Sequence, residues 1–234
     1  MGLALGRLLG ISFELVRGCF PDQRRQRYGD AEYDWEHRVD TTSATVSWRS
    51  RLMGLLNSPY QPIPEDQFRE MMRALNIDFS RFTFIDIGSG KGRALMLASE
   101  YGFRRIIGVE LLPELDRIAR QNLTRLRERG KNLPVELVCG DAIDFAFPAE
   151  PTVVFLFNPL PTSSLARMLQ NIKGNLQKRP HPLYLAYANA VLEHTIVESQ
   201  LFSKLAGTRE FSLFYNSGFS KSGLPGFESS VGRL

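Results

Sequence analysis

The most constraining feature of the sequence is a glycine-rich turn between a short apolar segment and a helical pattern. Residues 82–87 are apolar, aromatic or β-branched apart from Asp86, which predicts a buried strand. Gly88, Gly90 and Gly92 come next, and glycines allow a tight turn and let a ligand approach the backbone amides at a helix start. The apolar residues after the turn recur at helical spacing: Ala94, Leu95, Leu97, Ala98 and Tyr101. The pattern therefore predicts a cofactor-binding turn.

The spacing of the glycines restricts the choice of cofactor. Residues 88–92 read GxGxG, whereas the dinucleotide-binding fingerprint is GxGxxG, and a phosphate loop ending in GK[ST] is absent. Asp86 stands two positions before the first glycine, where a carboxylate suits an ammonium group better than a pyrophosphate. An NAD-binding module is therefore the less favoured interpretation.

The segment DIGSGKG at residues 86–92 resembles the first motif, [DE]xGxGxG, of class I (seven-strand) S-adenosylmethionine-dependent methyltransferases. The resemblance implies that Asp86 and the backbone of Gly88, Ser89 and Gly90 hold the methionine end of S-adenosyl-L-methionine. A Tyr-Gln-Pro-x-Pro turn at residues 60–64, followed by a helix containing FREM, also resembles a bacterial subgroup of this family. The similarity then extends from about Tyr33 to Asn189, and Tyr60 and Gln61 are expected to fold back over the cofactor.

Acidic residues follow the next two predicted strands. Glu110 ends the strand predicted at 105–110, about 20 residues after the glycines, where an acidic group can accept hydrogen bonds from both ribose hydroxyls. The alternative is an ordinary surface charge at a strand end. The strand that starts at Val135 runs into Asp141 and Ala142, and the family resemblance implies that Asp141 meets the adenine amino group and the Ala142 amide a ring nitrogen.

The fourth predicted strand, 153–157, ends in Asn158-Pro159-Leu160-Pro161. It resembles the [DNS]PP[YFW] motif of amino-group methyltransferases, whose polar residue holds the target nitrogen and whose aromatic ring stacks on a planar substrate. This chain keeps Asn158 but lacks the aromatic residue, which disfavours a flipped nucleobase as acceptor. We expect Asn158 to orient a nucleophile and to lie beside the cofactor, with a protein lysine nitrogen as the first expectation. The alternative is that Asn-Pro merely ends the strand.

The stretch from Pro21 to Asp40 mixes charged residues with two tyrosines and a tryptophan. A purely flexible linker seldom has this composition, so an ordered arm is predicted, which either covers the sheet or forms a lid that recognises the substrate. Any deprotonation that the reaction requires could come from Asp34, His37, Tyr60 or a substrate-bound water, and the sequence does not choose among them. A lone histidine such as His37 is more often a structural residue than a base.

Alternating strand and helix patterns predict an α/β fold with a doubly wound, mostly parallel, seven-stranded (Rossmann-like) sheet. We assign residues 79–234 to this methyltransferase domain and residues 1–78 to a helical N-terminal extension and lid. The later elements are expected as strands at 183–188, 209–215 and 227–231, with helices at 65–75 and 191–205.

The net charge of +4 and the pI near 9.2 permit an acidic partner without requiring one. The missing aromatic residue after Asn158 favours a protein or small-molecule acceptor over nucleic acid. Cys19 and Cys139 match no metal or disulfide spacing, and Cys139 is expected in the core. Because the cysteines fit no disulfide pattern, a reducing cytoplasm is the expected location. No apolar run approaches the roughly 20 residues that span a bilayer, so no transmembrane segment is expected.

The sequence thus predicts a methyltransferase that uses S-adenosyl-L-methionine, with no metal. Two alternatives stay open. A non-catalytic scaffold would bind the cofactor without transferring a methyl group, and an aminopropyl transferase of the same fold would use the decarboxylated cofactor.

Overall fold

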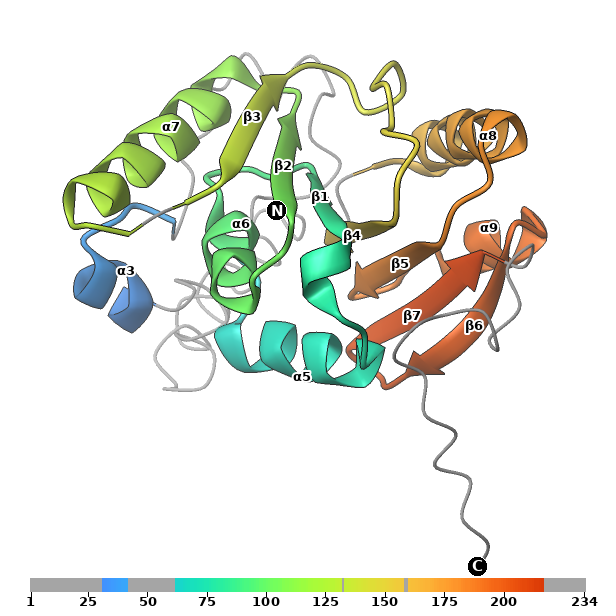
Figure 1. Ribbon diagram of the computed structural model, residues 1–234, viewed down its shortest axis with the longest axis horizontal. Helices are drawn as coiled ribbons and strands as arrows, with labels where there is room; N and C mark the ends of the chain where they lie inside the picture. The colour runs from blue at the N-terminus through green and yellow to red at the C-terminus, as the bar shows by residue number, and fades with distance from the viewer. Residues whose placement is uncertain (1–30, 42–61, 132, 158–159, 217–234) are drawn as a thin grey trace, which may run out of the picture.

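The computed structural model describes residues 31–41, 62–131, 133–157 and 160–216 (Figure 1). These residues form a seven-stranded sheet in the order β3-β2-β1-β4-β5-β7-β6. The first five strands pair in parallel, and β7 runs antiparallel to both β5 and β6. The strands are β1 (Thr83–Ile87), β2 (Arg105–Glu110), β3 (Val135–Cys139), β4 (Thr152–Phe157), β5 (Leu183–Ala188), β6 (Phe202–Gly207) and β7 (Phe211–Asn216). The predicted mostly parallel, doubly wound sheet is confirmed.

Helices cover both faces of the sheet, which explains why β1, β4 and β5 are buried along almost their whole length (Figure 1). One hydrophobic cluster joins the sheet to α5 (Glu65–Leu75), α6 (Arg93–Ala98) and α7 (Pro113–Glu128). A second cluster joins the other face to α8 (Thr162–Lys178) and α9 (Glu193–Glu198). Single 3₁₀ turns at Phe79–Arg81 and Ser99–Tyr101 flank β1 and α6. None of the helices in the described ranges has the length and apolar character needed to cross a bilayer.

The helix predicted before the first strand is confirmed as α5. Pro64 precedes its first turn, and Asn76 ends it in the left-handed conformation at a φ of 46°. Its buried side chains pack into the same cluster as the sheet residues Phe84 and Phe155, and Phe68 meets both rings edge to face. This helix from the N-terminal extension therefore shares its core with the sheet.

The predicted helix at 191–205 is wrong in its second half. Helix α9 ends at Glu198, Gln200 takes a left-handed φ of 56°, and β6 then begins at Phe202. β6 forms an antiparallel hairpin with β7, which is the strand predicted at 209–215. Pairing with β7 outweighs a helical apolar pattern because β6 lies at the sheet edge and needs only partial burial. The strand predicted at 227–231 lies outside the described residues.

Cys139 also differs from its prediction, since its side chain is exposed and does not lie in the core. It is the last residue of β3, and β3 is the other edge strand of the sheet. An apolar run in the sequence does not distinguish an edge strand from a central one.

Candidate functional site

The glycine-rich turn leaves β1 at the carboxyl edge of the sheet. Gly88, Gly90 and Gly92 have φ angles of 72°, 54° and 89°, a region that residues with a Cβ seldom adopt. The amides of Gly88 and Ser89 donate to the Val109 carbonyl at 2.8 and 3.1 Å. The turn is therefore fixed onto the end of β2 and leads directly into α6.

Glu110, at the end of β2, reaches back to this turn. Its carboxylate accepts a hydrogen bond from the Gly90 amide at 2.8 Å and another from the Leu112 amide at 2.8 Å. The side chain is buried, and burial raises its pKa above the usual range despite the opposing effect of these two amides. The carboxylate is thus held against the glycine turn in a fixed orientation.

Asp86 is a buried acid on β1, two residues before the turn. Among the residues that the structure describes, its carboxylate has no hydrogen-bond partner. Burial raises its pKa well above the ordinary value, and the nearby Glu110 carboxylate adds to the rise. Such a group gains most from a cation, so this position fits the ammonium group of an amino acid.

The third acidic residue, Asp141, follows β3. The Gly140 amide donates to the Glu110 carbonyl at 2.9 Å, which continues the ladder between β2 and β3 to this point. Asp141 is half-buried and accepts from the Ile143 amide at 2.9 Å, while Ala142 is buried in the second hydrophobic cluster. The structure therefore places Asp86, Glu110 and Asp141 along one edge of three adjacent parallel strands.

Three further predicted site residues, Tyr60, Gln61 and Asn158, lie outside the described residues. Their expected places over the cofactor and beside the acceptor stay predictions.

A residue that the sequence analysis did not single out, Gly108, controls how closely the turn approaches β2. A Cβ on Gly108 would lie 2.6 Å from Leu95 Cδ1 and 2.9 Å from both Leu137 Cδ2 and Ser89 Oγ. A glycine inside a strand is the available signal, because it often marks a close approach of another segment. Gly108 therefore lets α6 and the glycine turn pack directly on the sheet.

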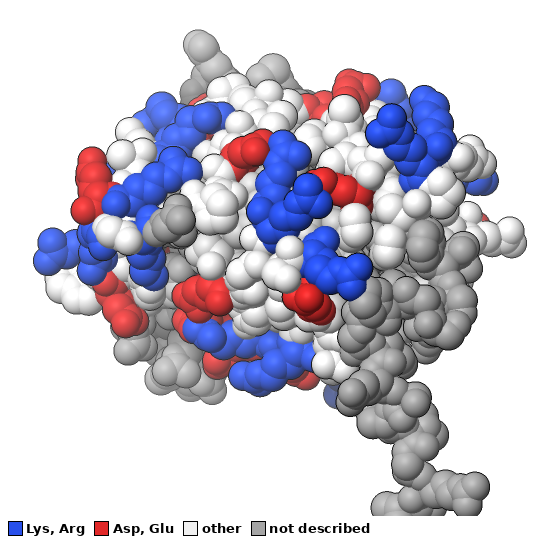
Figure 2. Space-filling model, in the orientation of Figure 1, with Lys and Arg blue, Asp and Glu red and all other residues white. Residues whose placement is uncertain are grey.

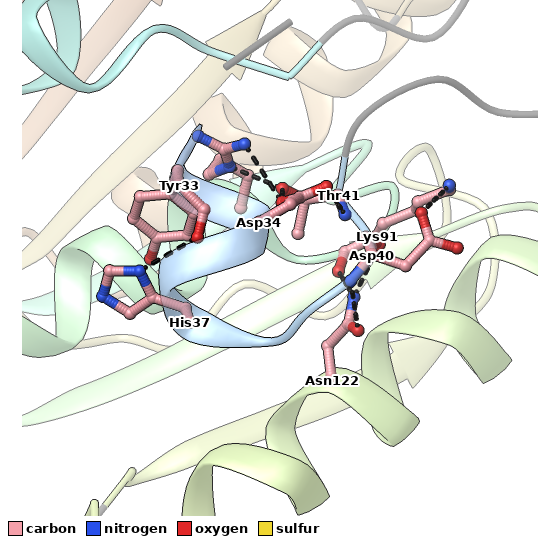
Figure 3. A network of polar contacts seen from close by, with 8 residues as sticks. Tyr33, Asp34, His37, Asp40, Thr41, Lys91 and Asn122 are labelled. Carbon is pink, nitrogen blue, oxygen red and sulfur yellow. Dashed lines mark hydrogen bonds and ion pairs between the residues drawn. The ribbon is translucent and has the colours of Figure 1, made fainter. Parts of the chain in front are cut away.

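The arm at residues 31–41, which begins with α3 (Ala31–His37), docks on the start of α6 (Figure 3). Arg93 is the first residue of α6, and its buried guanidinium donates to Thr41 Oγ1 at 2.6 Å and to Asp34 Oδ1 at 3.2 Å. The guanidinium also lies 4.0 Å from the centre of the Tyr33 ring. The prediction of an ordered arm is confirmed for this part, although no sequence pattern indicated these partners.

A second set of contacts joins the arm to the glycine turn and α7 (Figure 3). Lys91 Nζ pairs with Asp40 Oδ1 at 2.5 Å. Asn122 of α7 donates to the carbonyls of Asp40 and Lys91 at 2.8 and 3.1 Å and accepts from the Asp40 amide at 2.9 Å. The arm, the turn and α7 are thus joined through one amide side chain.

Two of the three candidate bases can be placed. Asp34 accepts from the Thr41 amide at 2.7 Å, from the Thr41 hydroxyl and from Arg93, so its carboxylate is committed to the arm. His37 stacks on the Tyr33 ring and lines a pocket with Arg129 beyond the C-terminal end of α7. The 16 residues of α7 span about 24 Å, so His37 lies far from the end of β2. These contacts favour a structural role for both side chains.

Comparison with known proteins agrees with this geometry. A family model described as a methyltransferase domain matches residues 84–179, from β1 to just past α8. No curated protein is significantly similar to the sequence.

Solved structures with a similar fold are distant in sequence. An RNA methyltransferase from Salinibacter ruber in complex with S-adenosyl-L-homocysteine is 23% identical with a TM-score of 0.44, over 66% of this chain and 91% of that one. A ribosomal protein L11 methylase from Lactobacillus delbrueckii subsp. bulgaricus is 14% identical with a TM-score of 0.47, over 70% and 81%. The magnesium protoporphyrin IX methyltransferase of Synechocystis is 12% identical with a TM-score of 0.46, over 84% and 97%. Likenesses at this level carry no argument about the acceptor.

Proposed function

We propose that the chain is a class I S-adenosylmethionine-dependent methyltransferase in which the acidic edge of β1, β2 and β3 holds the cofactor for methyl transfer to a nucleophilic acceptor. The methyltransferase-domain model that matches residues 84–179 supports this proposal. The observation that carries this proposal is the buried Asp86 carboxylate, which has no hydrogen-bond partner in the described part of the chain and stands beside the glycine turn. A cationic amino group is the chemistry that such a carboxylate accepts.

The remaining contacts follow the strand order. The Asp86 carboxylate takes the ammonium group. The turn at residues 88–90 packs against the rest of the methionine end, and its three amides are already bound to the Val109 carbonyl and to Glu110. Glu110 takes the ribose hydroxyls, because an ionised carboxylate has about four acceptor sites and the amides of Gly90 and Leu112 occupy two of them. Asp141 takes the adenine amino group, and the Ala142 amide takes a ring nitrogen. Tyr60 and Gln61 close over the cofactor.

S-Adenosyl-L-methionine supplies a methyl group on a sulfonium, which is already a good leaving group. The protein therefore contributes alignment of the acceptor and exclusion of water rather than strong activation. Asn158 orients the acceptor nucleophile from the end of β4.

For the acceptor we propose a protein lysine nitrogen, supported by the Asn-Pro strand end and by the lack of an aromatic residue after it. The mixed charge on the face shown in Figure 2 is not typical of a nucleic-acid site. Basic side chains are interspersed with acidic ones over the face shown in Figure 2. Several are also paired: Arg105 with Glu136 at 2.6 Å, and Arg69 with Glu65 at 2.6 Å and Glu100 at 3.0 Å. A nucleic-acid site usually presents a continuous basic surface.

The test is isothermal titration with S-adenosyl-L-homocysteine of the wild type, Asp86→Ala and Asp66→Ala. Asp66 is a matched control, since it is an exposed aspartate in the first turn of α5. We expect binding by the wild type and the control and none by Asp86→Ala. Absence of binding by folded wild type contradicts the proposal.

The acceptor is tested with radiolabelled methyl donor and cell lysate, followed by hydrolysis of the labelled product. Methyl-lysine supports the lysine assignment, whereas label in a small molecule or in RNA contradicts it. Binding without any transfer favours the scaffold alternative. Reaction with the decarboxylated cofactor alone favours the aminopropyl transferase alternative.

A further inference from the structure

The buried contacts between the arm and the glycine turn have no part in the cofactor contacts above. We propose that Asp34 is a positioning residue, which through Arg93 holds the glycine turn in its cofactor-binding shape, so that docking of the arm and binding of the cofactor are coupled. This inference rests on the proposed function of the turn.

In the ion pair of Asp34 and Arg93, the arginine is buried and the aspartate is largely shielded from solvent. The Arg93 side chain is 2% exposed and the Asp34 side chain 11% exposed. The pair fixes the first residue of α6, which follows Gly92 and its left-handed backbone directly. A buried guanidinium is costly when its carboxylate partner is withdrawn. Release of the arm would therefore make the present position of Arg93, at the start of α6, less stable.

The second contact holds the other side of Gly92. Lys91 has a side chain that is only 4% exposed, and it pairs with Asp40 of the arm. Asn122 donates to the carbonyls of both Asp40 and Lys91. The backbone of Lys91 and its side chain are therefore both held in place. The arm thus holds Lys91 and Arg93, the residues on either side of Gly92. Lys91 directly follows Gly90, whose amide binds Glu110.

These contacts link two equilibria. A cofactor that binds the ordered turn binds more tightly when the arm has already imposed that order, because less ordering is left for the binding step to supply. By linkage, the cofactor must strengthen the docking of the arm by the same factor. A structural ion pair without this role would change thermal stability but leave affinity unchanged.

The experiment compares Asp34→Asn, which keeps the side-chain shape, with Glu36→Gln on the same helix. Glu36 is exposed, and its backbone carbonyl accepts a hydrogen bond from Arg129, beyond the C-terminal end of α7. S-Adenosyl-L-homocysteine is titrated at a temperature at which circular dichroism finds all variants folded. We expect Kd to rise roughly tenfold for Asp34→Asn, to change less than about twofold for Glu36→Gln, and to recover in part for Asp34→Glu.

Hydrogen exchange supplies the second readout. In the wild type, S-adenosyl-L-homocysteine should slow exchange of amides in residues 31–41, and in ligand-free Asp34→Asn the amides of residues 88–93 should exchange faster than in the wild type. If Asp34→Asn does not fold, Asp40→Asn tests the second contact, whose Asp40 side chain is 55% exposed. Unchanged Kd and unchanged exchange in folded Asp34→Asn overturn the inference. A wild type that does not bind the ligand, with faster exchange at 88–93 in Asp34→Asn, overturns the cofactor site and keeps the positioning of the turn.

Discussion

Glu110 accepts a hydrogen bond from the Gly90 amide at 2.8 Å, across 20 residues of sequence. The bond connects the turn after β1 to the end of β2, and the other carboxylate oxygen accepts from the Leu112 amide at the start of α7. One side chain therefore sets the spacing between the glycine turn and the next helix. The same carboxylate is the group proposed to bind the ribose.

Glu110→Gln should weaken binding of S-adenosyl-L-homocysteine by about 1.5 to 3 kcal/mol, because a carboxamide turns one NH₂ donor toward a backbone N–H donor. Titration calorimetry measures the loss. Glu136→Gln is the control. Glu136 lies on the edge strand β3, and its carboxylate makes an exposed ion pair with Arg105 of β2; such pairs contribute only about 0 to 1 kcal/mol. Equal affinities for Glu110→Gln and the wild type would remove Glu110 from the ribose site.

Cofactor binding should release a proton from Asp86. In the ligand-free protein burial raises the pKa of Asp86 well above its usual range, and an ammonium partner favours the ionised form. Affinity should therefore rise as the pH rises toward the raised pKa, since less work is needed to remove the proton. Titrations in two buffers that differ in ionisation enthalpy measure the released protons. Asp86→Asn should show no release, and identical apparent heats for the wild type in both buffers would contradict the assignment.

The same raised pKa predicts a cost in stability. A carboxyl group whose pKa is higher in the folded state binds more protons when folded, so stability falls as the pH rises from the unfolded value of about 3.8 through the folded one. Asp86→Asn removes the ionisable group and should raise the Tm of the ligand-free protein at pH 7 while weakening cofactor binding. Thermal melts of both proteins at pH 4 and pH 7 test this, and the difference in Tm should be larger at pH 7. A lower Tm for Asp86→Asn at pH 7 would show that the buried Asp86 carboxylate does not destabilise the folded protein.

Local sequence patterns predicted the part of the fold that the glycine turn organises. The strands at 105–110 and 183–188 have the bounds expected from their β-branched, aromatic and apolar residues. The positions of Asp86, Glu110 and Asp141 at one edge followed from the rule that parallel strands end on the same side. The pattern failed at 199–205, where pairing between β6 and β7 decides the structure and residues at helical spacing form a strand.

Contacts between distant segments were not predictable in the same way. Asp34 and Arg93 are 59 residues apart, and neither is marked by any local motif as a buried pair. Asn122 reads as one polar residue on an amphipathic helix, yet it is fully buried between the arm and the turn. Such residues become recognisable only when the fold brings their partners together.

Gly108→Ala should destabilise the protein by about 1 to 3 kcal/mol, the usual cost of overpacking a core. The added methyl group would lie 2.6 Å from Leu95 Cδ1 and 2.9 Å from Ser89 Oγ, so the Leu95 and Ser89 side chains would have to move from their present positions against β2. Because Ser89 belongs to the glycine turn, cofactor affinity should fall together with stability. Gly174→Ala is the matched control, since a Cβ there meets nothing within 4 Å and alanine is favoured over glycine inside helix α8 by roughly 0.5 to 1 kcal/mol. Chemical denaturation should show lower stability for Gly108→Ala and higher stability for Gly174→Ala. Ligand titration should show weaker binding for Gly108→Ala alone. Unchanged affinity in a destabilised Gly108→Ala would mean that the turn does not depend on its close packing against β2.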